Sequence, residues 1–225
     1  MISKTKELPE VLEPSAEVVK LKNMAAAYPD EIKLFKETNT GAFILILGSD
    51  AIITGEIDAD EVKQFLLFSG AKSVFSTADN LAALFGNGNF EAVNVVIREN
   101  CKPGGSNTFT YDFLSREAYS LLKDGGFTLP EYEYFATDYC RRKNKGLLKV
   151  FGKKDSCIAL TLEGEKYRLL SGIVSNVNGL GGALLLTAVS GEKSVIAVCR
   201  DELLPFYIKY GFKPLYKAGY WRKHN

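Results

Sequence analysis

The order of the elements predicted for the second half of the chain constrains its fold most. Apolar patterning and turn residues predict strands at 132–140, 147–151, 156–162 and 167–174, a helix at 183–189, a strand at 194–199 and a helix at 202–210. Short polar turns join the first three strands, as expected of an antiparallel meander. The strand at 167–174 then leads through a glycine-rich stretch into a helix, which is typical of a βαβ unit. A meander joined to such a unit predicts a mixed sheet that helices cover in part on both faces.

The first half is predicted to contain a hairpin followed by alternating helices and strands. Before the hairpin, residues 7–38 show helical spacing, and Pro29 marks the expected start of a second helix. The predicted elements that follow are the hairpin at 42–57, a helix that Asp58 or Asp60 caps and Gly70 ends, a strand at 73–76, a helix at 79–85 and a strand at 92–97.

Proline, glycine and serine are concentrated in residues 99–107, which makes this segment the best candidate for a domain boundary. We therefore expect a first domain at 1–100, a linker at 101–107 and a second domain at 108–225. The predicted fold class is α+β (mixed α/β), with a mostly antiparallel sheet flanked by helices.

Composition and charge exclude several classes of protein. The chain has 225 residues, 46% of them apolar, and no apolar run approaches the ~18 residues of a membrane-spanning helix. The first nine residues include Lys4, Lys6 and Glu7 and have no apolar core, so we expect no secretory signal and a cytoplasmic location. The net charge is +1, and no dense basic stripe accompanies a nucleic-acid-binding motif, so neither nucleic acid nor a membrane is an expected partner.

Cysteine and histidine usage argues against metal and triad chemistry. The four cysteines, Cys101, Cys140, Cys157 and Cys199, lie far apart and form no C-x-x-C pair. The single histidine, His224, stands next to the last residue. We therefore expect reduced thiols, no metal site and no histidine-dependent triad.

Two segments carry the candidate chemistry. The glycines at 179, 181 and 182 precede a helix, where unpaired backbone N–H groups bind phosphate, although the same glycines also suit tight packing. Residues 203, 206, 207 and 210 form one apolar face of the next helix, which Gly211 ends. This face is either a core face with two buried tyrosines or the source of one tyrosine hydroxyl that donates a proton. The G-x-G-x-x-G spacing of dinucleotide-binding folds is absent.

In this order, these segments resemble the GCN5-related N-acetyltransferase (GNAT) family over residues 131–223. The most specific match is PFYIKYGF, residues 205–212, which is close to the family's Phe-Tyr-x-x-x-Gly-Phe junction. The stretch at 176–183 is similar to the family's acyl-CoA pyrophosphate loop, with Asn176 at the position of the usual arginine or glutamine. The first half resembles a divergent copy of the same fold, which implies two tandem halves.

The resemblance implies a cosubstrate, acetyl-CoA, and a set of site residues. Tyr207 matches the tyrosine that protonates the departing thiolate, and backbone groups at 171–174 are expected to pair with the pantetheine arm. One of these N–H groups would polarise the thioester carbonyl. Water or a carboxylate is expected to deprotonate the amine, and Asp138, on the strand predicted at 132–140, is the candidate carboxylate. The expected cofactor-binding residues are Ile173, Val174, Asn176, Asn178, Gly179, Leu180, Gly181, Gly182 and Ala183.

Two functions follow from this resemblance. The first is N-acetyl transfer to the amine of a small molecule or peptide. The alternative is a catalytically degenerate module that senses CoA or another ligand, or that binds a partner protein. Asn176 and the absence of lysine and arginine from 169–192 favour the alternative, because phosphates would then depend mostly on backbone N–H groups. The oligomeric state does not follow from the sequence.

Overall fold

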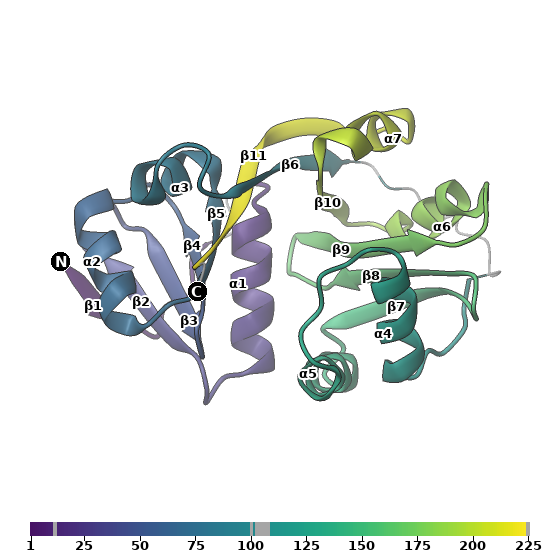
Figure 1. Ribbon diagram of the computed structural model, residues 1–225, viewed down its shortest axis with the longest axis horizontal. Helices are drawn as coiled ribbons and strands as arrows, with labels where there is room; N and C mark the ends of the chain where they lie inside the picture. The colour runs from purple at the N-terminus through teal and green to yellow at the C-terminus, as the bar shows by residue number, and fades with distance from the viewer. Residues whose placement is uncertain (11–12, 100, 102–108, 224–225) are drawn as a thin grey trace. The chain divides into compact units, whose positions relative to one another are not determined.

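The computed structural model describes residues 1–10, 13–99, 101 and 109–223. It divides into two compact units (Figure 1). The first comprises residues 1–96, 198–205 and 214–225, and the second comprises residues 97–197 and 206–213. The predicted halves, 1–100 and 108–225, are each continuous in sequence, whereas these units are not. The predicted linker at 101–107 lies outside the described residues except for Cys101.

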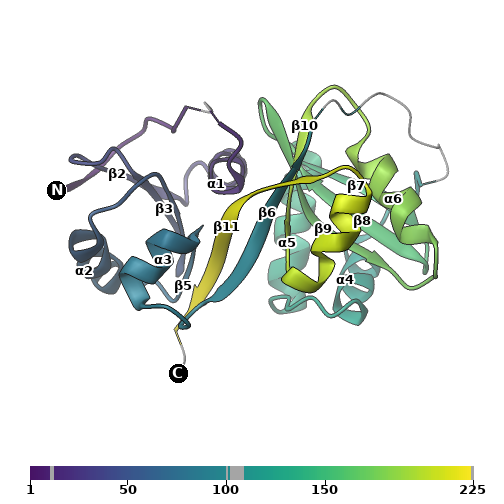
Figure 2. The ribbon, with the colours of Figure 1, turned by 90° about the horizontal axis from the view of Figure 1, so that it is seen from above.

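The first unit is a sheet of seven strands in the order β1-β2-β3-β4-β5-β11-β6, with helix α1 on one face and helices α2 and α3 on the other (Figures 1 and 2). Its elements are β1 (Ile2–Lys4), α1 (Ala16–Ala27), β2 (Lys33–Glu37), β3 (Phe43–Leu47), β4 (Asp50–Thr54), α2 (Ala59–Ser69), β5 (Ser73–Thr77), α3 (Ala78–Phe85), β6 (Glu91–Arg98) and β11 (Lys213–Arg222).

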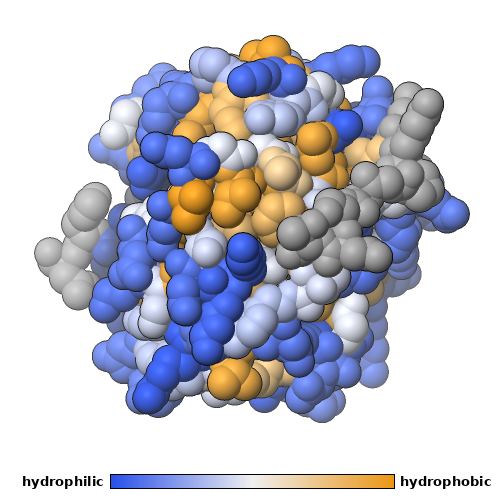
Figure 3. Space-filling model, turned by 90° about the vertical axis from the view of Figure 1, so that its right-hand side faces the viewer, coloured by the Kyte–Doolittle hydropathy of each residue, from blue (hydrophilic) through white to orange (hydrophobic). Residues whose placement is uncertain are grey.

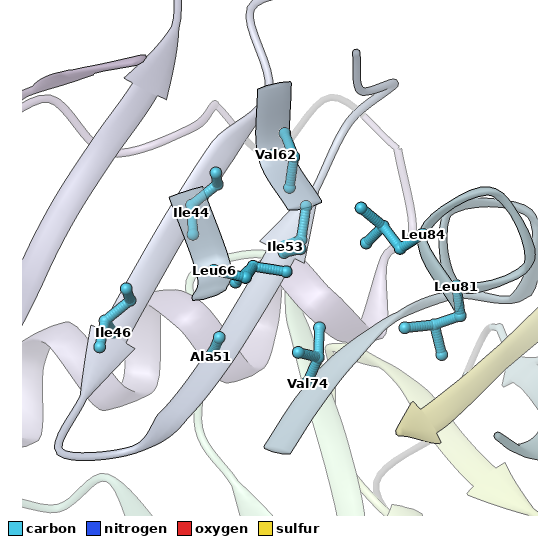
Figure 4. Packing of buried hydrophobic residues seen from close by; sticks show 9 residues of the cluster. All are labelled: Ile44, Ile46, Ala51, Ile53, Val62, Leu66, Val74, Leu81 and Leu84. Atoms are coloured by element: carbon cyan, nitrogen blue, oxygen red, sulfur yellow. The ribbon is translucent and has the colours of Figure 1, made fainter. Parts of the chain in front are cut away.

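One hydrophobic core cluster of the first unit lies between its sheet and helices α2 and α3 (Figure 4). Helix α2 forms where the sequence predicts it: the Asp58 side chain accepts the N–H of Glu61, and Gly70 ends the helix in the left-handed conformation (φ 74°). The residues shown in Figure 4 are Ile44, Ile46, Ala51, Ile53, Val62, Leu66, Val74, Leu81 and Leu84.

The second unit has a sheet in the order β10-β9-β8-β7. Helices α4 and α5 cover one face, and α6 packs against the strands from the other (Figure 2). Its elements are α4 (Ser115–Asp124), α5 (Tyr132–Asn144), β7 (Leu148–Lys153), β8 (Cys157–Leu162), β9 (Tyr167–Ser175), α6 (Leu180–Val189), β10 (Ser194–Cys199) and α7 (Leu204–Lys209), and the 3-10 turn Asp201–Leu203 before α7 belongs to the first unit.

Arg168 anchors the C-terminal end of α6 to β9. Its side chain is buried, and its guanidinium donates hydrogen bonds to the carbonyl oxygens of Ala188, Val189 and Ser190 at 3.3, 3.0 and 2.8 Å. A cation at a helix C-terminus satisfies carbonyls that have no intrahelical donor and complements the helix dipole. The contact therefore fixes how α6 lies on β9, the strand that precedes it.

The two halves of the chain repeat one sequence of elements. In the first, the antiparallel strands β2, β3 and β4 precede α2 and a strand, β5, that pairs with β4 in parallel. In the second, β7, β8 and β9 precede α6 and a strand, β10, that pairs with β9 in parallel. The last strand of the chain, β11, pairs with β5 in the first unit. The predicted mixed, mostly antiparallel sheet and its tandem halves are confirmed.

Two predicted elements are wrong in type. Residues 132–140 form the start of helix α5 rather than a strand, because Phe135, Tyr139 and Arg142, at i, i+4 and i+7, make one helical face; Tyr139 and Arg142 are buried. The helix expected after Pro29 is strand β2, which pairs with both β1 and β3. Short apolar runs fit either element, and strand pairing decides between them. In the described part of the chain, no helix is long and apolar enough to cross a membrane.

Candidate functional site

One edge of β9 is the first part of the candidate site. Strand β10 pairs with β9 over four residue pairs, from Tyr167–Ser194 to Leu170–Ala197, and β9 continues for five residues beyond Leu170. Ser171 is an extra residue in β9 at this point, because the register with β8 shifts between Leu160 and Thr161. Bulges of this kind turn backbone groups away from the ladder and recur beside active sites. The bulge thus coincides with the end of the parallel pairing.

The loop after β9 and the first turn of α6 form the second part. Gly179 precedes the helix in the left-handed conformation, with φ 86°. A Cβ built on Gly179 would meet no atom within 4 Å, and one on Gly181 would make an ordinary 3.7 Å contact with the Ser175 side chain. The backbone is therefore open to close approach by a ligand, and the first N–H groups of α6 have no acceptor within the helix.

The charge of this segment comes from its backbone. Residues 175–189 include no ionisable side chain, and α6 is apolar on nearly every side. Val177 in the loop and Leu186 in the helix are 45% and 41% exposed. Figure 3 views the side of the molecule drawn at the right of Figure 1 and shows apolar residues gathered in its upper half. The helix N-terminus, with its partial positive charge, is therefore the source of attraction for an anion within this segment.

The corresponding segment of the first unit has the opposite character. Helix α2 begins with Asp58, Asp60 and Glu61, and the Asp58 side chain already occupies the N–H of Glu61 at 3.3 Å. The buried carboxylate of Glu37 accepts the N–H of Asp58 at 3.2 Å. Because these carboxylates take up the helix N–H groups and repel anions, the start of α2 is unsuited to bind phosphate. The start of α6 in the second unit has no such carboxylates, because residues 175–189 include no ionisable side chain.

Tyr207 lies in α7 and is 3% exposed. Its ring packs edge-on against Phe206 and Phe212, with centroids 5.5 and 5.2 Å apart. Its carbonyl oxygen accepts the N–H groups of Tyr210 and Phe212, and Gly211 takes the left-handed conformation (φ 82°). The predicted helix stop is confirmed, and the tyrosine belongs to a tightly packed aromatic junction.

Tyr210 reaches the start of α6. A Cβ built on Gly182 would lie 1.7 Å from the Tyr210 hydroxyl oxygen, so this hydroxyl occupies the space beside the first turn of the helix. A side chain at position 182 would therefore require the Tyr210 ring to move. The sequence predicts a role for Tyr207 as the proton donor and none for Tyr210. The available signal was the pair of adjacent glycines, which marks a close approach by another group.

Asp138 lies in α5, which packs against α4 and β7. Its two carboxylate oxygens accept hydrogen bonds from the Arg142 Nε at 2.8 and 2.9 Å, one helical turn along. The candidate base is thus part of an i,i+4 ion pair, on a helix rather than on the predicted strand. Its role as a base stays a prediction.

Carboxylates gather at one place in the first unit. Oxygens of Glu37, Asp58 and Glu61 lie within 4.8 Å of one another. The buried Glu37 carboxylate accepts hydrogen bonds from the Thr40 hydroxyl and the Asp58 N–H, and the Met1 ammonium binds Glu61. These contacts already use the oxygens that a cation would need, and we assign no metal to them.

The cysteines are free thiols, and we expect only one of them to react quickly. Cys140 is exposed, whereas Cys101, Cys157 and Cys199 are buried. Burial raises the pKa of the three buried thiols, that of Cys199 to about 11. A raised pKa leaves less thiolate, the reactive form, at pH 8. Titration with an aromatic disulfide reagent should give one fast thiol in the folded protein and four after denaturation; two or more fast thiols would contradict this.

Comparison with known proteins identifies the fold. No protein-family model matches the sequence, and no curated protein matches it. The structure is similar to a GCN5-related N-acetyltransferase from Sphaerobacter thermophilus, with 13% identity, 91% of each chain covered and a TM-score of 0.52. It is also similar to a tandem GNAT protein from the clavulanic acid biosynthesis pathway, with 10% identity, a TM-score of 0.52, and 96% of this chain and 89% of that chain covered.

Proposed function

We propose, on the basis of the GCN5-related N-acetyltransferase fold that this chain has, that it transfers an acetyl group from acetyl-CoA to the amine of a small molecule or peptide. The observation that carries the proposal is the edge of β9 beyond Leu170, where the Ser171 bulge coincides with the end of the β10 pairing. This edge leads directly into the glycine start of α6, so one continuous stretch of backbone offers groups for both the pantetheine arm and the diphosphate.

In this proposal the backbone does most of the binding. Strand groups at 171–174 hydrogen-bond to the amides of the pantetheine arm, and the N–H groups of the first turn of α6 hold the diphosphate. The Tyr210 hydroxyl, beside Gly182, is a further donor for a phosphate oxygen and positions the cofactor. Since 175–189 lacks lysine and arginine, binding depends on these backbone groups and on side chains from elsewhere in the chain.

The proposed chemistry is direct attack by the amine. An N–H at the β9 bulge polarises the thioester carbonyl, an effect commonly worth about 3 kcal/mol for each donor. The amine nitrogen forms a bond to the carbonyl carbon, and the tetrahedral intermediate collapses as the carbon–sulfur bond breaks. Tyr207 donates its hydroxyl proton to the departing thiolate, and water or Asp138 takes the proton that the amine loses. The products are the N-acetylated amine and free CoA.

Asn178→Asp tests the site. The substitution keeps the side-chain shape and places a negative charge directly before Gly179, as Asp58 does before α2. Repulsion of a diphosphate by one charge costs about 1–2 kcal/mol near a surface, so acetyl-CoA affinity should fall about tenfold. Isothermal titration calorimetry with acetyl-CoA measures this, and Asn39→Asp, an exposed site in the first unit, is the control with the same charge change.

Each outcome of this titration is informative. Wild-type protein that is folded and releases no heat at millimolar acetyl-CoA would end the proposal. Binding that Asn178→Asp and Asn39→Asp weaken equally would place the diphosphate away from α6. Binding that only Asn178→Asp weakens supports the site, and release of CoA thiol with a panel of amines then tests for transfer.

Two observations favour a second candidate function, a module that binds CoA or another ligand without catalysis. The first is that Asn176 stands at the position of the usual arginine or glutamine and that residues 175–189 include no lysine or arginine. The second is that the Tyr207 side chain is almost completely buried. This candidate predicts acetyl-CoA binding without turnover and no effect of Tyr207→Phe on that binding. The enzyme proposal predicts turnover that depends on Tyr207.

A further inference from the structure

A pocket of about 610 Å³ lies in the first unit, outside the residues of the proposed acetyl-CoA site. Residues from α2, α3, the turn after α3, the start of β6 and the end of β11 line it. On β11, Arg222 lies opposite Ser73, the first residue of β5, so the pocket lies beside the beginning of that strand and away from its end at Thr77. A pocket of this volume accommodates a small organic ligand.

Aromatic rings form one wall of the pocket. Phe85 and Trp221 stack face to face, with centroids 4.0 Å apart and planes 5° from parallel, and both are half-buried. Phe90, also half-buried, packs over Gly219, where a Cβ would lie 2.7 Å from its ring. Rings held in this way offer a flat apolar surface to a ligand ring and lose little entropy on binding.

The turn between α3 and β6 forms another wall and is ordered by its own contacts. Gly86 and Gly88 take φ values of 85° and 83°. The Asn89 side chain donates a hydrogen bond to the carbonyl oxygen of Phe85 at 2.7 Å, and the Asn89 N–H donates to the carbonyl of Gly86. The pocket is therefore largely formed before a ligand enters, which lowers the cost of binding.

The charge around the pocket is positive. Lys63, Arg222 and Lys223 line it, and none of the three forms an ion pair with a residue that the structure describes. The acid that lines it, Glu91, is already bound to Arg200 at 3.0 Å. Lys223 directly follows the last residue of β11, and it lines the pocket together with Trp221. A cation thus stands beside the aromatic wall.

We propose that this pocket binds a small anion with a flat aromatic ring, whose charge is a carboxylate or a phosphate. The ring packs against the wall of Phe85, Phe90 and Trp221, and the acidic group meets Lys63 and Lys223. This chemistry fits both an aromatic carboxylate and a nucleoside monophosphate. The proposal does not depend on acetyl transfer, because every lining residue belongs to the first unit.

The single tryptophan of the chain makes the test direct, because Trp221 is itself in the pocket. Its fluorescence, excited at 295 nm, is followed while adenosine monophosphate or phenylacetate is added to the full chain. We expect a saturable change with at least one of them, with a Kd below about 1 mM. Neutral adenosine lacks the acidic group, and inorganic phosphate lacks the aromatic ring. Each should bind at least tenfold more weakly.

A charge variant locates the binding. Lys63→Gln/Lys223→Gln should weaken binding of the anion at least tenfold, whereas Lys4→Gln/Lys33→Gln, with the same loss of charge on exposed positions of β1 and β2, should leave it unchanged. No saturable change with either anion would overturn the proposal, as would equal effects of the two variants. If only adenosine monophosphate binds, the pocket is a nucleotide site. If only phenylacetate binds, it is a site for an aromatic acid. Acetyl-CoA calorimetry on the same variants should be unaffected.

Discussion

The Gly152→Ala variant should lose about 3 kcal/mol of unfolding free energy. A Cβ built on Gly152 would lie 2.2 Å from the carbonyl oxygen of Cys157 and 2.8 Å from the ring of Phe113. The first of these atoms is backbone in β8, the strand that pairs with β7 through Gly152–Ile158 and Lys153–Cys157. The oxygen cannot move away without breaking that ladder, and Phe113 is buried in the core of the unit. A side-chain rotation therefore cannot relieve the clash between the new methyl group and the Cys157 carbonyl oxygen.

Gly146→Ala is the matched control for this variant. Gly146 has a φ of 68°, and a Cβ there would meet no atom within 4 Å. Its substitution should cost only the left-handed backbone strain, about 1 kcal/mol. Urea unfolding followed by circular dichroism measures the free energy of unfolding of both variants. Equal losses in the two variants would mean that β7 and β8 do not pack at Gly152 as described.

The Tyr207→Phe variant is expected to lower kcat for acetyl transfer about 10²-fold, the usual contribution of a general acid. The KM for acetyl-CoA should change less than twofold, because the ring and its contacts with Phe206 and Phe212 remain. A larger loss is not expected, since a free thiol has a pKa near ~8.5 and its thiolate leaves without full protonation. Steady-state kinetics, in which the released CoA thiol is measured, gives kcat and the KM for acetyl-CoA.

Tyr210→Phe is expected to show the reverse pattern. Its hydroxyl lies beside Gly182 at the start of α6, where we place the diphosphate, so its loss should raise the KM for acetyl-CoA and leave kcat nearly unchanged. If Tyr207→Phe keeps full turnover while Tyr210→Phe loses it, the acid is Tyr210. If both variants bind acetyl-CoA and the wild type shows no turnover, the module without catalysis is the better account.

Much of the fold could be predicted because local signals and tertiary structure agree. The caps of α2 stand where residue type alone places them. Helix α6 begins at Leu180 after Gly179, three residues before the predicted start at 183, so Gly181 and Gly182 lie within its first turn. Of the two errors of type, α5 has a helical face at Phe135, Tyr139 and Arg142 that the predicted strand at 132–140 did not take into account, whereas β2 is a short run whose deciding contacts are distant in sequence. For β2, those contacts are its pairing with β1 and β3.

The candidate site was predictable only in part. Motif spacing indicated the loop at 176–183 and the tyrosine at 207, and both lie in the second unit. The Ser171 bulge depends on the register between β8 and β9, which a single sequence does not reveal. The approach of Tyr210 to Gly182 is a tertiary contact. The pairing of Asp138 with Arg142 was missed because the segment was predicted as a strand, in which the two would not be neighbours.

Hydrogen exchange in the presence of acetyl-CoA tests the central claim most directly. The account predicts slower exchange of the backbone amides at 171–175 and 179–183 when acetyl-CoA is bound, because these groups hold the pantetheine arm and the diphosphate. It predicts no change at 55–61, where carboxylates surround the start of α2. Bound acetyl-CoA that leaves 171–183 unchanged, or that slows exchange at 55–61 instead, would contradict the account.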